Sequence, residues 1–333
     1  MVFGLIIQSI LTLCVMLETL EKIDGIQLFF SNQNRIWLNI TIAFIMFGVA
    51  LELHVGDFRQ LLKRPRAAFV GILSQFVLLP LFTFFLVYLF RNNITLTVGL
   101  GMILVASCPG GNVSNFISAL AKGNIALSVS LTAFSSIAGL FLTPVLFAYW
   151  GNLFVTYYYE ANGSELLRPL HVDPWNIFST ILLILGIPIL LGLSFRVKFP
   201  DMTKKILPTI KRLSILTFAS MVIFIFIKNY ELFLEYVFYI FLLVLLHNAI
   251  ALGIGYFSGR VFRLPKRDCK TISIETGIQN SGLALALLFD PLVFPEDMAV
   301  GGMTFIAAWW GVWHIVAGLA VAGAWSGFSV KSE

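Results

Sequence analysis

Ten stretches of mainly apolar residues, separated by short polar connections, run along the chain. They lie at roughly 2–17, 36–53, 67–90, 95–121, 124–149, 176–195, 213–228, 236–258, 271–289 and 299–325. A helix that crosses a bilayer needs about 20 apolar residues. We therefore predict ten transmembrane helices, crossings 1 to 10, of which the first and seventh are short. The first run lacks the basic start and cleavage site of a signal peptide, and we interpret it as a helix.

Two of these crossings carry residues that disrupt a helix. Crossing 4 contains the segment 108–115 with Pro109 and two glycines, and crossing 9 contains the segment 275–282 with Gly277. Proline removes a backbone donor, and irregular backbone at membrane depth is tolerated only where protein or water satisfies its polar groups. Paired broken helices in the two halves of a chain are typical of a secondary transporter's binding site.

Composition places the chain in the bilayer. Hydrophobic residues make up 59% of the 333 residues and charged residues only 12%, about half the charged share of a soluble protein. The mean hydropathy is +0.91. The net charge of +5 comes from basic residues in short connections, which does not indicate nucleic-acid binding. The three cysteines are scattered and predict neither a disulfide framework nor a metal site.

The basic residues also predict the orientation. If the crossings alternate in direction, 17 of the 22 Lys and Arg residues fall on one side of the membrane. Basic residues accumulate on the cytoplasmic side, so we expect both termini in the cytoplasm and the protein in the inner or plasma membrane.

The two halves of the chain correspond. Crossings 1–5 and crossings 6–10 each end with a broken helix followed by a long one. Because five is odd, the second copy enters the membrane from the opposite side. The predicted fold is an all-α integral membrane protein built from two inverted five-helix repeats, with broken helices 4 and 9 meeting at mid-membrane, an arrangement suited to alternating access.

Glu275 is the strongest candidate for chemistry, because an ionisable group inside a crossing is costly and usually functional. A pairing with Lys270 near the membrane surface is the simpler alternative. Uncharged oxygen-bearing side chains accompany it in the breaks and in crossings 3 and 5: Gln75, Asn112, Ser114, Asn115, Ser128, Thr132, Gln279, Asn280 and Ser281. Hard oxygen ligands with one negative charge suit an alkali cation. Helix N-termini at the breaks attract anions, so we expect an organic anion as cargo and Na⁺ as coupling ion.

Several motifs resemble the bile acid:sodium symporter family. They are Cys-Pro-Gly-Gly-Asn-Val-Ser-Asn at 108–115, the segment 121–132, Ser-Gln-Phe at 74–76, Glu-Thr-Gly-Ile-Gln-Asn-Ser-Gly-Leu-Ala at 275–284, Met46-Phe-Gly-Val-Ala-Leu, and Val312-Trp-His. The resemblance covers nearly the whole chain. It implies a core domain, 67–149 and 236–325, that holds crossings 3–5 and 8–10. It also implies a panel domain, 1–66 and 176–235, that holds crossings 1–2 and 6–7.

The resemblance further implies two sodium sites. The first would use Ser114, Asn115, Ser128, Thr132 and Glu275. The second would use Gln75, Glu275, Gln279 and the backbone carbonyls of Thr276 and Ile278.

Cargo positions also follow from the resemblance, which places Asn112, Val113, Asn280, Ser281 and His314 near the substrate. Family members often carry Asn after this histidine, where the chain has Ile315. The cargo classes of the family are bile acids, sulfated steroids and small carboxylates such as pantoate. A structural hydrogen bond is an equal interpretation of His314, and we expect His247 to pack within crossing 8.

Four alternatives stay open at this point. The protein could couple transport of an organic anion to protons through Glu275 or leave it uncoupled, or it could carry arsenite. It could also be an integral-membrane enzyme that uses Glu275 with His247 or His314 as acid and base, although no nucleophile motif or metal-ligand spacing supports that chemistry.

Overall fold

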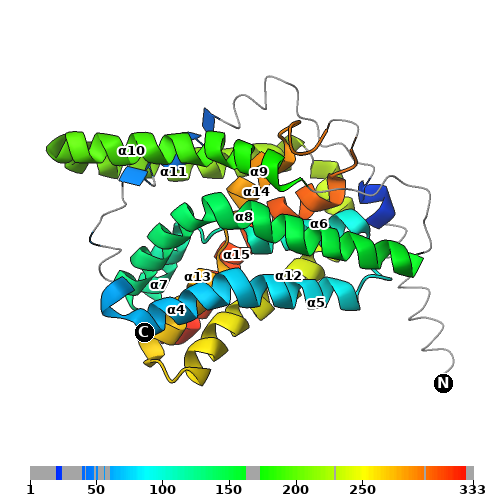
Figure 1. Ribbon diagram of the computed structural model, residues 1–333, viewed down its shortest axis with the longest axis horizontal. Coiled ribbons are helices and arrows are strands. Elements are labelled where there is room, and N and C mark those ends of the chain that lie inside the picture. Colours follow the sequence, from blue (N-terminus) through cyan, green and yellow to red (C-terminus); the bar gives the residue numbers. More distant parts are fainter. Residues whose placement is uncertain are drawn as a thin grey trace, which may run out of the picture.

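The computed structural model describes residues 20–24, 40–41, 43–48, 50–51, 56, 61–162, 173–228, 230–295 and 298–327. This part of the chain consists of helices and their connections (Figure 1). The elements are α4 (Pro65–Leu73), η1 (Ser74–Leu78), α5 (Leu79–Leu89), α6 (Leu96–Ser107), α7 (Val113–Leu120), α8 (Ile125–Asn162), α9 (Pro174–Ile181), η2 (Leu182–Gly186), α10 (Ile187–Lys198), α11 (Pro200–Lys228), α12 (Tyr230–Val261), α13 (Lys266–Gly277), α14 (Ser281–Leu288) and α15 (Gly301–Ser326).

Five helical segments in the described ranges are long and apolar enough to cross a membrane. They are Pro65–Leu89, Ile125–Ala161, Pro174–Lys198, Ile240–Val261 and Gly301–Ser326. These segments match predicted crossings 3, 5, 6, 8 and 10. Crossings 4 and 9 are each divided into two short helices, crossing 1 lies outside the described residues, and crossing 2 is described in part. The chain is an integral membrane protein with several spans.

Two predicted boundaries were wrong. Helix α8 continues to Asn162, into the segment 150–175 that we expected to be a connection, and α11 begins at Pro200, within the expected link 196–212. Hydropathy detects only the apolar part of a helix, whereas helix propensity is also high for Lys, Arg and Glu. Pro200 stands at the first position of α11, where a missing backbone N–H costs nothing.

Two π-helical turns interrupt the long spans, and in each case a proline follows after one intervening residue. In η1 the Leu79 N–H donates to the Ser74 carbonyl, and Pro80 follows. In η2 the Ile187 N–H donates to the Leu182 carbonyl, and Pro188 follows. Proline cannot donate the next hydrogen bond and its ring crowds the preceding turn, so a widened turn accommodates it. Gln75, a predicted sodium ligand, lies within η1.

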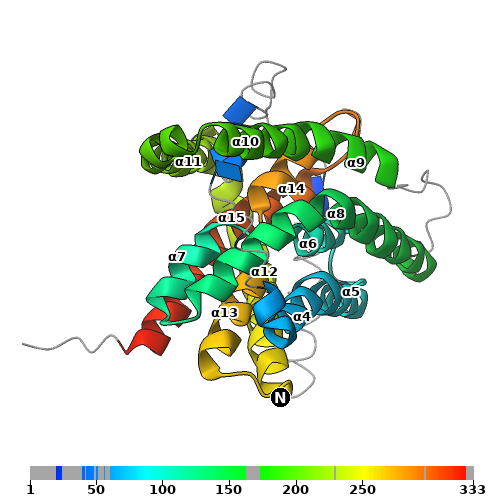
Figure 2. The same ribbon diagram turned by 60° about the vertical axis from the view of Figure 1, so that its left-hand side comes forward.

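The helices are arranged in layers. In Figures 1 and 2, α9, α10 and α11 lie along one side of the molecule, α8 lies in the middle, and α4 and α5 lie on the opposite side. Glycines allow close packing: a Cβ on Gly101 of α6 would lie 2.7 Å from the Met303 Cα of α15, and one on Gly255 of α12 would lie 2.6 Å from the Ser273 Cα of α13. The main apolar core fills the interior between these helices.

The described part of crossing 2 packs on α10 and α11. The rings of Phe47 and Phe195 meet edge to face at 6.2 Å. The Arg196 guanidinium donates to the Leu51 carbonyl, and a Cβ on Gly48 would lie 2.8 Å from Ser214 Oγ of α11. Crossing 2 therefore lies in contact with crossings 6 and 7.

Candidate functional site

The two broken helices cross at their breaks, as the sequence predicted. Gly110 and Gln279 form an isolated antiparallel β-bridge. The Gly111 N–H donates to the Ile278 carbonyl at 2.9 Å, and the Asn280 N–H donates to the Pro109 carbonyl at 2.8 Å. These bonds satisfy backbone groups that have lost their helical partners, which removes the main cost of irregular backbone inside a membrane.

Glycine is required at this crossing because the backbones of the two breaks approach each other closely. A Cβ on Gly110 would lie 2.8 Å from Gln75 Nε2 and 3.4 Å from Glu275 Oε2. A Cβ on Gly111 would lie 3.2 Å from the Gln279 carbonyl oxygen. The same measurements place Gln75, from η1, beside the carboxylate of Glu275, from α13. Crossings 3, 4 and 9 therefore meet at one point.

Glu275 is buried and accepts hydrogen bonds from three hydroxyl groups on α7 and α8. Ser114 Oγ donates to Oε1 at 2.7 Å, and Ser128 Oγ also donates to Oε1. Thr132 Oγ1 lies 3.0 Å from Oε2 and 3.2 Å from Oε1. The exposed fraction of Glu275 is 1%. The alternative pairing with Lys270 was wrong, because the Lys270 ammonium donates to the carbonyls of Ala121 and Trp325 instead.

Asn115 completes the first predicted group. Its Oδ1 accepts a hydrogen bond from Thr132 Oγ1 at 3.2 Å. All five side chains expected in the first sodium site are thus linked around one carboxylate. Ser128 and Thr132 share a face of α8 because they are four residues apart.

The second predicted group lies at the end of α13. Gln279 Nε2 donates to the Thr276 carbonyl at 2.9 Å, while the Ile278 carbonyl accepts from Gly111. Each carbonyl oxygen has two lone pairs and keeps one for another partner. Gln75 Nε2 and Gln279 Oε1 are buried and have no hydrogen-bond partner among the described residues.

The donor set fits a hard cation. Carboxylate, hydroxyl, amide and carbonyl oxygens are the ligands that such ions prefer. Buried polar atoms are normally paired, and an acceptor such as Gln279 Oε1 that lacks a donor has its lone pairs available. The residues present therefore suit Na⁺ at both predicted groups.

The predicted cargo positions lie at the starts of α7 and α14. Asn112 precedes the first residue of α7, and the Asn280 side chain caps α14 by accepting from the Leu283 N–H at 3.1 Å. Ser281 is buried against α15, with its Oγ 2.8 Å from the position of a Cβ on Gly311. His314, one turn further along α15, is also buried. Val113 and the two asparagines are partly exposed.

His247 packs in α12, as expected. Its Nε2 forms a hydrogen bond of 2.7 Å with Thr83 Oγ1, and its ring lies 4.7 Å from that of Trp310. The hydrogen-bond partners of Glu275 among the described residues are hydroxyls, so neither histidine is joined to the carboxylate as an acid–base pair would be.

Sequence reasoning missed Asn248. Its Nδ2 donates to the Gly277 carbonyl at 2.7 Å, and it is fully buried. Gly277 ends α13, where carbonyls lose their helical donors, so Asn248 satisfies one of them from the neighbouring helix α12. An amide inside an apolar span was the available signal.

Comparisons with known proteins found a matching family model and several relatives. Residues 39–236 match the model of the Sodium Bile acid symporter family. The chain is 32% identical over 293 residues to the uncharacterized sodium-dependent transporter YocS of Bacillus subtilis, covering 87% of this chain and 83% of YocS. It is 28% identical to the probable sodium/metabolite cotransporter BASS1 of Arabidopsis thaliana, covering 87% of this chain and 66% of BASS1. It is 29% identical to the human P3 protein, covering 78% of this chain and 52% of that protein.

The relatives from Bacillus and Arabidopsis are named as transporters and not as enzymes. Since the family model covers more than half of the chain and the resemblance to YocS spans most of both proteins, this chain is a sodium-dependent membrane transporter that belongs to the sodium bile acid symporter family.

Proposed function

We propose that the protein is a sodium-coupled symporter that moves one organic anion with two Na⁺ ions by alternating access. The observation that carries this proposal is the convergence of Ser114, Ser128 and Thr132 on Glu275. These groups come from both broken helices and from crossing 5. An ion held by them would bind best when the two broken helices are correctly placed.

The two ion sites share one carboxylate in this proposal. Ser114, Asn115, Ser128, Thr132 and Glu275 form the first site, and Gln75, Glu275, Gln279 and the carbonyls of Thr276 and Ile278 form the second. The unpaired Oε1 of Gln279 and the nearness of Gln75 to Glu275 support the second site. Because Glu275 serves both sites, the two ions are expected to bind cooperatively.

The cargo is proposed to bind at the first residues of α7 and α14. Both short helices begin beside the crossing, and a helix N-terminus carries unpaired N–H groups and a partial positive charge. Asn112, Val113, Asn280, Ser281 and His314 are the proposed contacts. Two Na⁺ with a monoanion move one net positive charge, so uptake would gain about 2.3 kcal/mol per 100 mV of membrane potential.

Transport is proposed to occur by movement of a core domain, 67–149 and 236–325, against a panel domain, 1–66 and 176–235. Crossings 1–5 and 6–10 are the proposed inverted repeats, and each repeat contributes helices to both domains. The contacts of crossing 2 with α10 and α11 support the panel grouping. Orientation with both termini in the cytoplasm follows from the distribution of basic residues.

Reconstituted vesicles test the proposal. An inward Na⁺ gradient should drive uptake of the organic anion, and a potential negative inside should increase it. Replacement of Na⁺ by choline at constant pH should stop it. If uptake persists in choline and follows a proton gradient, protons and not sodium are the coupling ion. A screen of organic anions by thermal unfolding, with and without Na⁺, identifies the cargo as the anion that stabilises only in sodium.

A further inference from the structure

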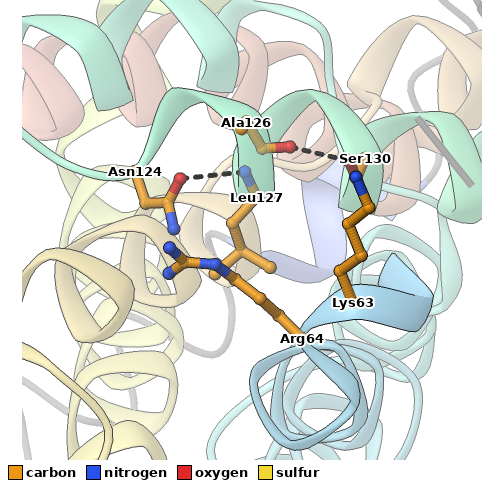
Figure 3. Close-up of a pocket in the computed structure, with 6 residues that line it drawn as sticks. All are labelled: Lys63, Arg64, Asn124, Ala126, Leu127 and Ser130. Atoms are coloured by element: carbon orange, nitrogen blue, oxygen red, sulfur yellow. Dashed lines mark hydrogen bonds between the residues drawn. The ribbon is translucent and has the colours of Figure 1, made fainter. Parts of the chain in front are cut away.

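A basic pocket that contains none of the proposed sodium ligands lies where α4 and α8 begin. Its volume is about 210 Å³, and it is lined by Lys63, Arg64, Asn124, Ala126, Leu127 and Ser130 (Figure 3). Liquid water takes about 30 Å³ per molecule, so the pocket has room for a group the size of a phosphate with some of its water. We call these six residues the basic pocket.

The basic pocket carries a net positive charge. Lys63 and Arg64 extend from the start of α4 toward the start of α8 (Figure 3), and among the described residues no carboxylate lines the pocket. Asp268 lies nearby, 3.5 Å from the Arg64 guanidinium, and also accepts from Asn124 at 2.7 Å. Asp268 is therefore paired with Arg64, although it is not among the residues that line the pocket. Among the described residues, Lys63 has no acidic partner within ion-pair distance.

The walls of the basic pocket are held in fixed positions. Asn124 Oδ1 accepts from the Leu127 N–H, and Ser130 Oγ donates to the Ala126 carbonyl (Figure 3). Leu127 and Ser130 are buried. Further along the same two helices, a Cβ on Gly71 would lie 2.6 Å from Leu131, so α4 and α8 pack closely there. The helices thus form a preformed hollow at their starts.

Apolar side chains are exposed next to this hollow. Leu62 is 79% exposed, Phe69 of α4 is 55% exposed and Ile125 of α8 is 52% exposed. In a membrane protein such side chains face lipid tails, while cations between helices at the membrane surface bind lipid head groups. The combination matches a molecule with a phosphate and a hydrocarbon chain.

We propose that the basic pocket binds the phosphate of an anionic phospholipid head group, with Lys63 and Arg64 as its cationic contacts and the lipid chains lying along α4 and α8. The same phosphate chemistry could be supplied by a soluble phosphate, and the test distinguishes the two sources. Arg suits bidentate contact with phosphate oxygens, and Lys supplies a point charge.

The test titrates the full chain in a nonionic detergent with phosphatidylglycerol, phosphatidylcholine or inorganic phosphate, and counts bound lipid by native mass spectrometry. We expect one retained phosphatidylglycerol per chain and weaker retention of phosphatidylcholine. Lys63→Gln should weaken retention about fivefold, the effect of one basic residue near an anionic surface. Arg66→Gln, on an exposed residue of α4 that does not line the pocket, should leave it unchanged.

A matched pair of variants at Ala126 removes no native contact. Ala126 lines the pocket and is exposed at the start of α8, where Glu is compatible with a helix. Ala126→Glu should abolish retention, whereas Ala126→Gln, of the same size without the charge, should keep it. Competition by millimolar inorganic phosphate would support the phosphate site and identify a soluble source. Equal retention of phosphatidylglycerol by wild type, Ala126→Glu and Lys63→Gln would overturn the proposal.

Discussion

Ser114 and Glu275 are joined by a hydrogen bond of 2.7 Å although 161 residues separate them in the chain. Ser114 stands in the first turn of α7, directly after one break, and Glu275 stands in the last turn of α13, directly before the other. The bond therefore connects the two broken helices by their side chains at the place where the β-bridge connects them by their backbones. Any cation held here contacts both halves of the crossing.

Glu275→Gln should abolish sodium-dependent uptake. The substitution keeps the size of the side chain and an acceptor oxygen but removes the negative charge shared by both proposed ion sites. Isothermal titration with NaCl and vesicle uptake measure the effect, and Glu231→Gln, at an exposed residue in the first turn of α12, is the control. Unchanged sodium affinity in Glu275→Gln would refute the shared ligand.

Gly110→Ala should reduce sodium-driven uptake at least tenfold. The new Cβ would lie 2.8 Å from Gln75 Nε2 and 3.4 Å from Glu275 Oε2, which forces these ligands or the crossing itself to move. Small displacements of positioned groups have large effects on function. Gly253→Ala is the matched control, because its Cβ would meet only the Phe257 ring, at 3.9 Å. Equal activity of the two variants would show that the crossing tolerates a side chain.

Asn248→Leu should destabilise the protein by about 1–3 kcal/mol, the cost of leaving a buried carbonyl without its donor. The carbonyl is that of Gly277, next to the proposed ligands of the second ion site. We also expect weaker sodium binding, since the end of α13 loses a support. Thermal unfolding in detergent and sodium titration measure both effects. Leu246→Ala, at an exposed position of the same helix, should change neither.

Asp24 lies outside the predicted membrane spans, and its pKa makes the stability of the protein depend on pH. Burial raises the pKa of its carboxyl from 3.8 to about 6, against the hydrogen bonds from Thr97 and Thr95. The folded protein therefore binds this proton more tightly than the unfolded chain. The stabilisation of the fold by this bound proton is fully present below pH 4 and is lost as the pH rises through 6. The loss in the free energy of unfolding is at most about 3 kcal/mol, at 1.36 kcal/mol per pKa unit.

The variant Asp24→Asn isolates this contribution. It should raise the unfolding temperature at pH 7 and remove the corresponding slope between pH 4 and pH 7, whereas Asp201→Asn, at an exposed residue of α11, should leave the slope unchanged. The measurement is the difference in unfolding temperature between variant and wild type at each pH. A difference that does not vary with pH would contradict the assignment to Asp24.

Sodium should stabilise the protein against heat, and choline should not. A ligand at 100 times its dissociation constant stabilises a single site by about 2.7 kcal/mol. Two coupled sites should give a steeper dependence on Na⁺ concentration than one. Thermal unfolding across a NaCl series at constant ionic strength measures this slope, which should flatten in Gln75→Leu, where only the proposed second site loses a ligand. An identical slope in that variant would argue against the second site.

The sequence alone determined the membrane class and the places where helices break. Both follow from local properties: apolar residues that require a bilayer, and proline and glycine that cannot continue a helix in hydrocarbon. The motif resemblance also named the family, which the comparisons confirmed. The last residues of α8 and the first residues of α11 were not predicted as helical, because polar residues that favour helices carry no hydropathy signal.

Only the tertiary structure decided which groups meet. The antiparallel bridge of Gly110 with Gln279, the π-turn that holds Gln75 and the bond from Asn248 to Gly277 each join segments or features that no local pattern specifies. The basic pocket is of the same kind, because Lys63 and Asn124 lie 61 positions apart and become neighbours only when α4 packs on α8. Hydrogen bonds and packing between distant segments depend on the complete fold, since each group finds its partner only after the helices have assembled.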